Sequence, residues 1–128
     1  MKFVNKALSF YLLVVILIAC EQKEIRDVSF KNDIQPIFSE HCSDCHYGED
    51  IEGNIKLDNY ESVKNSRYFN RDAPMFVAGN PEQSRIYIVV SSNREAVRMP
   101  PSDLDYDKLG EEEIETIKVW IKEGAKNN

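Results

Sequence analysis

The chain has 128 residues, enough for one domain but not comfortably for two. Its 22 acidic and 16 basic side chains give a formal net charge of −6 at pH 7, so we expect it to bind neither nucleic acid nor an anionic membrane surface directly. It contains three cysteines, two of them in one short segment, so we expect no disulfide framework.

Residues 1–19 are predicted to be an export signal. Lys2 and Lys6 make a basic start, and residues 7–19 are then apolar apart from Ser9. This run is shorter than the stretch of about 20 residues that crosses a hydrocarbon core, and it has the length of the apolar part of a signal peptide. We therefore expect the mature protein outside the cytoplasm.

Cys20 follows directly, at the end of the run Leu17-Ile18-Ala19-Cys20. A small residue before a cysteine at this place resembles the lipobox of bacterial lipoproteins, which implies cleavage before Cys20 and lipidation of its sulfur. The alternative is an ordinary secretory signal in which Cys20 is incidental. Under the first interpretation a lipid anchors the protein to a membrane, residues 20–28 form a polar tether, and residues 29–128 form the domain.

The domain is predicted to be all-α, with three main helices, loops between them and no convincing sheet. The first helix is expected ahead of the cysteine pair, with Asn32 or Asp33 as its cap. Its apolar side chains recur at i, i+3 and i+4 and so share one face: Ile34, Ile37 and Phe38. A shorter helix is expected over residues 60–64, capped by Asp58 or Asn59.

The second main helix is predicted to start at the run Asn80-Pro81-Glu82-Gln83. Asn80 is the expected cap, Pro81 suits the first helical position, and Gln83 completes a capping box. The helix would continue through residues 86–90, although the β-branched and aromatic side chains there make a strand the alternative.

The last helix is expected to begin at Gly110 and to stop near Gly124. Its first turn, Glu111–Glu113, places negative charge at the positive end of the helix dipole. One face is apolar and is predicted to enter the core: Ile114, Ile117, Trp120 and Ile121.

The run Cys42-Ser43-Asp44-Cys45-His46 has the spacing of a haem c attachment site. Two thiols separated by two residues can reach the two vinyl groups of one haem from a single helical turn, and the next residue places an imidazole beside the iron. Cys42 and Cys45 are then expected to form thioethers, and His46 to be the proximal iron ligand.

Three alternatives remain for this segment. A thioredoxin-like redox pair uses the same cysteine spacing, but it normally follows a strand, and no such pattern is visible here. A zinc site needs a fourth ligand, and His41, the other histidine, directly precedes Cys42. Chance occurrence in a helix is the third alternative. We favour haem because export delivers the chain to the compartment in which bacteria attach haem c.

The opposite face of the iron needs a second ligand or stays open. His41 lies on the same segment as His46 and is not expected to reach that face. Met99 stands in a polar loop and is fixed by the two prolines that follow it, whereas Met75 precedes apolar residues that suggest core packing. Met99 is the favoured distal ligand, with Met75 or an open position as the alternatives.

These motifs, in this order, resemble the class I cytochrome c domain in its planctomycete-type form. The resemblance implies a fold of three to four helices wrapped around one covalently bound haem c and its iron, with the first and last helices crossing. It implies Cys42, Cys45 and His46 for attachment and proximal ligation, and Met99 as the distal ligand. The matching stretches cover most of the mature chain: Phe30–Phe38, His41–His46, Ile55–Leu57, Ala78–Tyr87, Met99–Pro101 and Ile117–Ala125.

A histidine–methionine pair implies an electron-transfer protein and not an enzyme, because a thioether favours ferrous iron and the protein fills both axial positions. We therefore expect redox partner proteins and no small-molecule substrate. The expected location is the periplasmic side of a bacterial membrane or cell envelope, where the lipid on Cys20 holds the protein. The alternatives are a haem-based sensor or peroxidase-like protein, and a fixed electron-transfer subunit of a larger redox complex.

Overall fold

The computed structural model describes residues 27–49, 51–68 and 73–128. The predicted export signal over residues 1–19, the lipidation site Cys20 and most of the tether therefore lie outside the described residues. The described chain is helical and forms no β-strand apart from one isolated bridge, in agreement with the predicted all-α class. In these ranges no helix combines the length and the apolar character needed to cross a bilayer.

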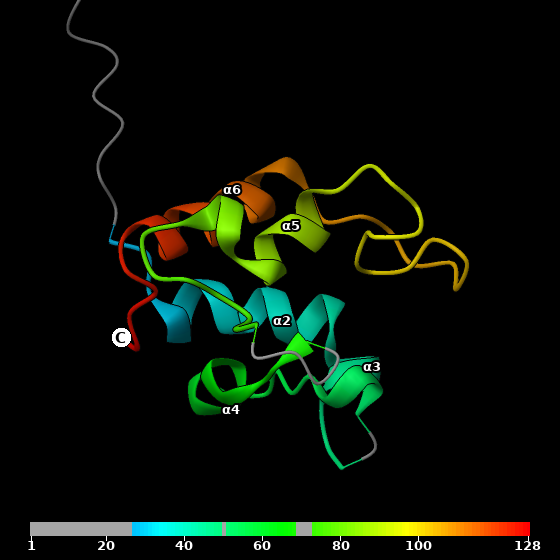
Figure 1. Cartoon of the computed structure of the whole chain (residues 1–128), viewed down its shortest axis with the longest axis horizontal. Coiled ribbons are helices and arrows are strands. Elements are labelled where there is room, and N and C mark those ends of the chain that lie inside the picture. Colours follow the sequence, from blue (N-terminus) through cyan, green and yellow to red (C-terminus); the bar gives the residue numbers. More distant parts are fainter. Residues whose placement is uncertain (1–26, 50, 69–72) are drawn as a thin grey trace, which may run out of the picture.

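Short helices joined by turns make up the fold. In Figure 1, α5 and α6 lie on one side of α2, and α3 and α4 lie on the other. The three main helices predicted from the sequence are α2, α5 and α6, and the shorter predicted helix is α4. The α-helices are α2 (Gln35–His41), α3 (Ser43–His46), α4 (Tyr60–Asn65), α5 (Arg85–Ser91) and α6 (Glu111–Lys122), and the turns are η1 (Phe30–Ile34), η2 (Glu52–Asn54) and η4 (Pro81–Gln83).

The first helical stretch begins earlier than predicted, so the expected cap at Asn32 or Asp33 is wrong. Ser29 is the cap: its Oγ accepts the N–H of Asn32 at 3.2 Å, and the Asp33 carboxylate accepts the N–H of Ser29 at 2.8 Å. These reciprocal bonds start the π-turn η1, which continues into α2. Pro36 lies in the first turn of α2, where its missing N–H is tolerated.

The helical interpretation of the segment after Gly79 is confirmed, but its predicted capping box is wrong. The Asn80 side chain makes no capping bond, and residues 81–83 form the separate 3-10 turn η4. Ser84 joins the two elements, because its buried Oγ accepts the N–H of Val77 and donates to the carbonyl of Asn80, each at 2.8 Å. The helix α5 therefore starts only at Arg85.

The other two helix starts agree with prediction. Asn59 caps α4 by accepting the N–H of Ser62 at 2.9 Å. At the start of α6, the Gly110 N–H donates to the Glu113 carboxylate at 2.7 Å, which satisfies one of the free donors of the first turn. Beyond the end of α6, Gly124 adopts a φ of 104°, a left-handed conformation that suits glycine.

An aromatic cluster around Trp120 connects the first and last helices. The Trp120 side chain is fully buried, its ring centroid lies 5.6 Å from that of Phe30, and its Nε1–H donates to the Lys126 carbonyl. Phe76 and Tyr60 complete the cluster at 5.1 Å and 6.5 Å from Trp120. The prediction that Trp120 is a core residue is therefore confirmed.

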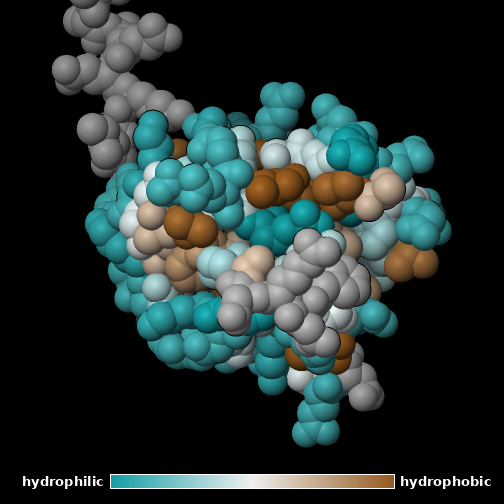
Figure 2. Space-filling model, in the orientation of Figure 1, coloured by the Kyte–Doolittle hydropathy of each residue, from teal (hydrophilic) through white to brown (hydrophobic). Residues whose placement is uncertain are grey.

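The surface contrasts with this core. The face of the molecule in Figure 2 is mostly hydrophilic, with small apolar patches.

Candidate functional site

A pocket of about 420 Å³ opens between the α2–α3 segment and the loop over residues 92–109. Its walls are almost entirely apolar, and a smaller cavity of about 70 Å³ shares part of its lining and reaches the core. The larger volume is in the range that holds a small molecule or cofactor. The structure brings together at this pocket the four predicted haem-binding residues, namely Cys42, Cys45, His46 and Met99.

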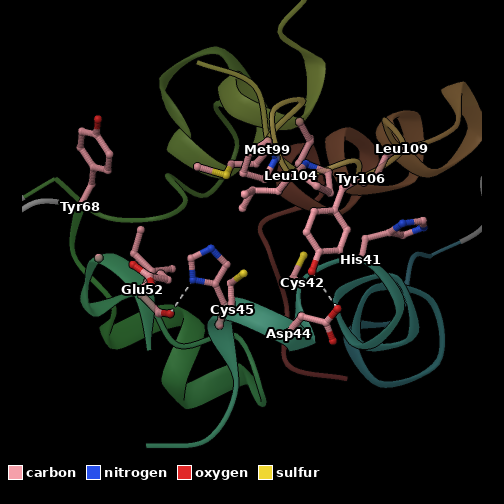
Figure 3. Close-up of a pocket in the computed structure, with 16 residues that line it drawn as sticks. His41, Cys42, Asp44, Cys45, Glu52, Tyr68, Met99, Leu104, Tyr106 and Leu109 are labelled. Atoms are coloured by element: carbon pink, nitrogen blue, oxygen red, sulfur yellow. Dashed lines mark hydrogen bonds between the residues drawn. The ribbon is translucent and has the colours of Figure 1, made fainter. Parts of the chain in front are cut away.

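One helical turn presents the cysteines and the histidine to the pocket. Cys42 closes α2 by donating its N–H to the Phe38 carbonyl at 3.0 Å, and its own carbonyl accepts the N–H of His46 at 2.9 Å. Because residues three and four apart share one face of a helix, Cys42, Cys45 and His46 point to the same side. Figure 3 shows both cysteines on the wall that faces Met99.

His46 is held in an orientation that suits an iron ligand. Its Nδ1 lies 3.0 Å from the carbonyl oxygen of Ile55. A carbonyl can only accept, so Nδ1 carries the proton and the neutral ring has its lone pair on Nε2. The His46 carbonyl also accepts the N–H of Leu57 at 2.9 Å, which fixes the loop between them. Metal-binding histidines typically donate their second nitrogen to a carbonyl in this way.

The Cys42 thiol has the opposite character from a redox-active cysteine. Burial raises its pKa to about 12, and the neighbouring Cys45 adds to the shift. A thioredoxin-like pair needs a lowered pKa, because the thiolate is the nucleophile. In the folded protein Cys42 is therefore protonated at neutral pH, which argues against the thiol-redox alternative.

Met99 and Met75 occupy different environments. The Met99 N–H donates to the Val89 carbonyl at 3.0 Å, and the side chain is 41% exposed at the mouth of the pocket, across from Cys42 and Cys45 (Figure 3). Met75 is 3% exposed and belongs to the hydrophobic core, although it also lines the inner cavity. The packing role predicted for Met75 is thus observed.

Hydrogen bonds that the sequence did not suggest connect the Met99 loop to the cysteine segment. Arg98 donates to the Tyr106 carbonyl at 3.0 Å, and the Tyr106 hydroxyl donates to the Asp44 carboxylate at 3.0 Å. The hydrogen bond to Asp44 raises the pKa of Tyr106, so the phenol stays protonated and keeps donating. The first bond lies within the loop, and the second links the loop to the opposite wall of the pocket.

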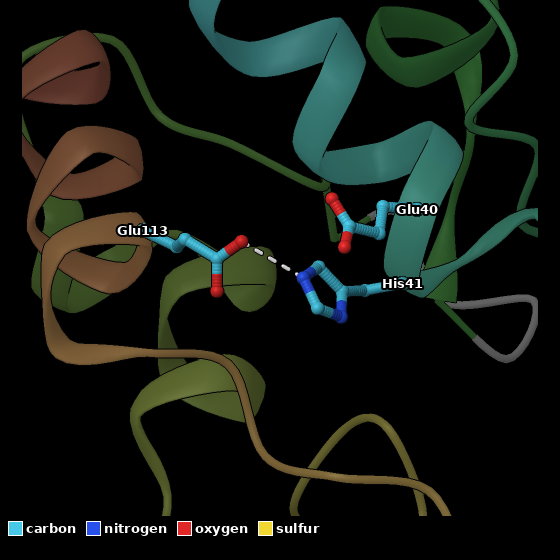
Figure 4. Close-up of side chains that lie close together, drawn as sticks. All are labelled: Glu40, His41 and Glu113. Carbon is cyan, nitrogen blue, oxygen red and sulfur yellow. Dashed lines mark hydrogen bonds and ion pairs between the residues drawn. The ribbon is translucent and has the colours of Figure 1, made fainter.

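His41 lines the same pocket and connects two helices. Its Nε2 lies 2.8 Å from the Glu113 carboxylate, so it joins the end of α2 to the start of α6 (Figure 4). The possible ligand atoms of Glu40, His41 and Glu113 lie within 4.8 Å of one another. Among the described residues this is the one group of three or more side chains that could hold a metal ion, and it contains no cysteine. The geometry of the described residues therefore lends no support to a zinc site at Cys42 and Cys45.

Comparison with known proteins gives one match. Residues 42–103 match a family model described as "Planctomycete cytochrome C". The matched segment begins at the first cysteine of the motif and includes Met99. No curated protein and no solved structure matches the chain.

Proposed function

We propose that this protein carries one covalent haem c between His46 and Met99 and transfers single electrons, because residues 42–103 match the family model of planctomycete cytochrome c. The family implies covalently bound haem c with its iron, and it suggests an electron carrier rather than an enzyme. The number of haems, the two axial ligands and the membrane anchor are our proposals.

The residues around the pocket fit this cofactor. Cys42 and Cys45 supply the two thiols for attachment, and both line an apolar pocket of about 420 Å³. His46 offers Nε2 as the proximal ligand, and Met99 offers a thioether from the opposite wall. The observation that carries the proposal is the hydrogen bond from His46 Nδ1 to Ile55, because it leaves Nε2 free to bind metal in a pocket that Met99 also lines.

When bound, haem c supplies an iron that alternates between ferric and ferrous forms by exchanging one electron. Met99 would favour the ferrous form because its sulfur is a soft, neutral ligand. With His46 and Met99 both holding the iron, no ligand position would be left for a substrate. The apolar walls would reduce contact of the cofactor with water, which would also favour the less charged, reduced centre.

The function is tested on the protein produced with a haem-attachment system. We expect a pyridine haemochrome assay to give one haem per chain and an optical redox titration to follow a one-electron Nernst curve, about 59 mV per tenfold change in the ratio of oxidised to reduced protein. Electron exchange with a soluble dye should be reversible. A protein that attaches no haem would contradict the proposal, and rapid peroxide turnover would favour the peroxidase-like alternative.

We further propose that a lipid on Cys20 tethers the domain outside the cytoplasm and that the acidic surface helps it to meet basic redox partners. The net charge of −6 supports steering toward a positively charged protein. The lipid anchor is supported by the position of Cys20 at the end of the apolar run.

Replacing Cys20 by serine is expected to release the protein from membranes into the soluble envelope fraction, because the sulfur is the site of lipid attachment. Fractionation followed by haem staining measures the change. The substitution Ser9→Ala, inside the same apolar run, is the control and should leave the protein membrane-bound. A Cys20→Ser variant that stays in the membrane fraction would show that the anchor is elsewhere.

A further inference from the structure

The end of α2 and the start of α6 bring Glu40, His41 and Glu113 together (Figure 4). Each side chain offers one ligand atom, and these three atoms lie within 4.8 Å of one another. His41 Nε2 is 2.8 Å from Glu113 Oε1, although the two residues are 72 positions apart in the chain. The proposed haem attachment and ligation use none of these three side chains, so their grouping needs a separate explanation.

The Glu113 carboxylate is held in the orientation of a ligand. Its Oε2 accepts the Gly110 N–H at 2.7 Å, which leaves Oε1 facing His41. Metal-binding carboxylates are typically fixed by hydrogen bonds of this kind from the surrounding protein. The side chains of His41 and Glu113 are 20% and 30% exposed, so both are largely shielded while one side stays open to water.

The charges of the cluster are not balanced by the described protein groups. The ion pairs of the described residues give Glu113 the His41 imidazole as its one partner, and they give Glu40 none. Two carboxylates at this separation disfavour each other's ionised form. A cation between them would remove that repulsion, and the imidazole nitrogen decides which cation suits the site.

We propose that Glu40, His41 and Glu113 bind one divalent transition-metal ion, with Zn²⁺ as the best match. Calcium and magnesium prefer oxygen ligands alone, whereas imidazole suits zinc. Three protein ligands with a remaining position for water make an open zinc site. Tetrahedral zinc holds its nitrogen and oxygen ligands about 3.3 Å apart, so Nε2 and Oε1 need to separate by about 0.5 Å. The exposed Glu40 side chain is free to move toward the ion.

Such an ion would join two elements that border the haem pocket. Cys42 follows His41 directly, and Leu109, which lines the pocket, lies just before α6. Because the ligands are far apart in the unfolded chain, the ion should bind the folded state selectively. At ten times its dissociation constant, Zn²⁺ should therefore shift the unfolding equilibrium about elevenfold toward the folded protein. Urea unfolding with and without Zn²⁺ measures this shift.

The direct test is calorimetric titration of the full, haem-loaded chain with zinc chloride. We expect one ion per chain and loss of binding in His41→Ala. Glu113→Gln, which keeps an oxygen for the Gly110 N–H, and Glu40→Gln should each weaken binding by about 10- to 100-fold, at least as much as losing a supporting residue does. The control is Glu112→Gln, which removes the same charge from an exposed neighbour on α6 and should bind Zn²⁺ normally.

Chemical labelling of histidine gives an independent measurement. The chain contains two histidines, and in the haem-loaded protein His46 is expected to be held by the iron. Diethyl pyrocarbonate should then label His41 alone, as intact mass shows, and Zn²⁺ should protect it. Glu112→Gln should keep this protection, whereas Glu113→Gln should lose most of it at the same Zn²⁺ concentration.

Attraction of zinc to the acidic surface in general gives a different pattern. In that case His41→Ala would bind Zn²⁺ like the native chain, or Glu112→Gln would weaken binding as much as Glu113→Gln. Either result overturns the inference and leaves the electron-transfer proposal intact. A chain that attaches no haem would instead refute the proposed function, and the four variants would still be comparable because all of them keep both cysteines and His46.

Discussion

Replacing both Cys42 and Cys45 by alanine is expected to reduce covalently attached haem from one per chain to none. Each thiol supplies one of the two links, so either single variant should retain a weakened, single attachment. Haem staining after a denaturing gel and the mass of the intact chain both measure the loss. The control is Ser43→Ala, which changes a residue between the two cysteines without touching a thiol and should attach haem normally.

The double variant is also expected to lose its cooperative fold. A pocket of about 420 Å³ left without its occupant would expose its apolar walls to water. This loss of buried apolar surface matters because the whole stability of a small domain is only about 5–15 kcal/mol. Urea unfolding followed by near-ultraviolet circular dichroism checks this. A sharp, native-like transition in the haem-free variant would show that the core around Trp120 suffices alone.

The substitution Met99→Ala is expected to abolish the weak red absorption band that sulfur-to-iron charge transfer gives in the oxidised protein. It should also lower the reduction potential, because a soft ligand that favours ferrous iron is lost. Exogenous cyanide should bind about 100-fold more tightly if the native distal position is open about 1% of the time, since the ligand no longer competes with the thioether. Absorption spectroscopy and a cyanide titration measure both effects.

Met75→Ala is the matched control for that experiment. Met75 is 3% exposed within the core, so its truncation should cost about 2–5 kcal/mol of stability while the red band survives. Loss of the band in Met75→Ala and its survival in Met99→Ala would reverse the ligand assignment. Loss in neither variant would point to a different sixth ligand or to an open position.

Features fixed by neighbours in the chain could be predicted from sequence. The cysteine–histidine motif lies on one helical turn, so its spacing alone places three side chains on one side. The Asn59 cap accepts the N–H of a residue three positions away, and Asn59 was one of the two candidates that the sequence offered, with Asp58. Where several nearby residues can cap a helix, the sequence does not decide between them. At the first helix the cap is Ser29 and not Asn32 or Asp33. Before α5 the buried Ser84 makes the hydrogen bonds, and the expected cap Asn80 makes none with its side chain.

Features that depend on loop closure could not be predicted. The Ile55 carbonyl reaches His46 only because the intervening loop folds back. Every residue has a backbone carbonyl, so the sequence does not indicate which one accepts the bond. The contact between Tyr106 and Asp44 spans 62 residues, so nothing in either local sequence suggests it.

The hydrogen bonds at the start of the domain bear on how an anchored protein would be oriented. The Asn128 carbonyl accepts the Lys31 N–H and the Ser29 hydroxyl, so the point where the tether enters is fixed beside Asn128. In Figure 1 this end lies far from the loop over residues 92–109. Residues 20–26, fully extended, reach at most about 25 Å. If Cys20 carries a lipid as proposed, so short a tether would keep this end of the domain near the membrane and would leave the mouth of the pocket facing the aqueous phase, where redox partners could reach it.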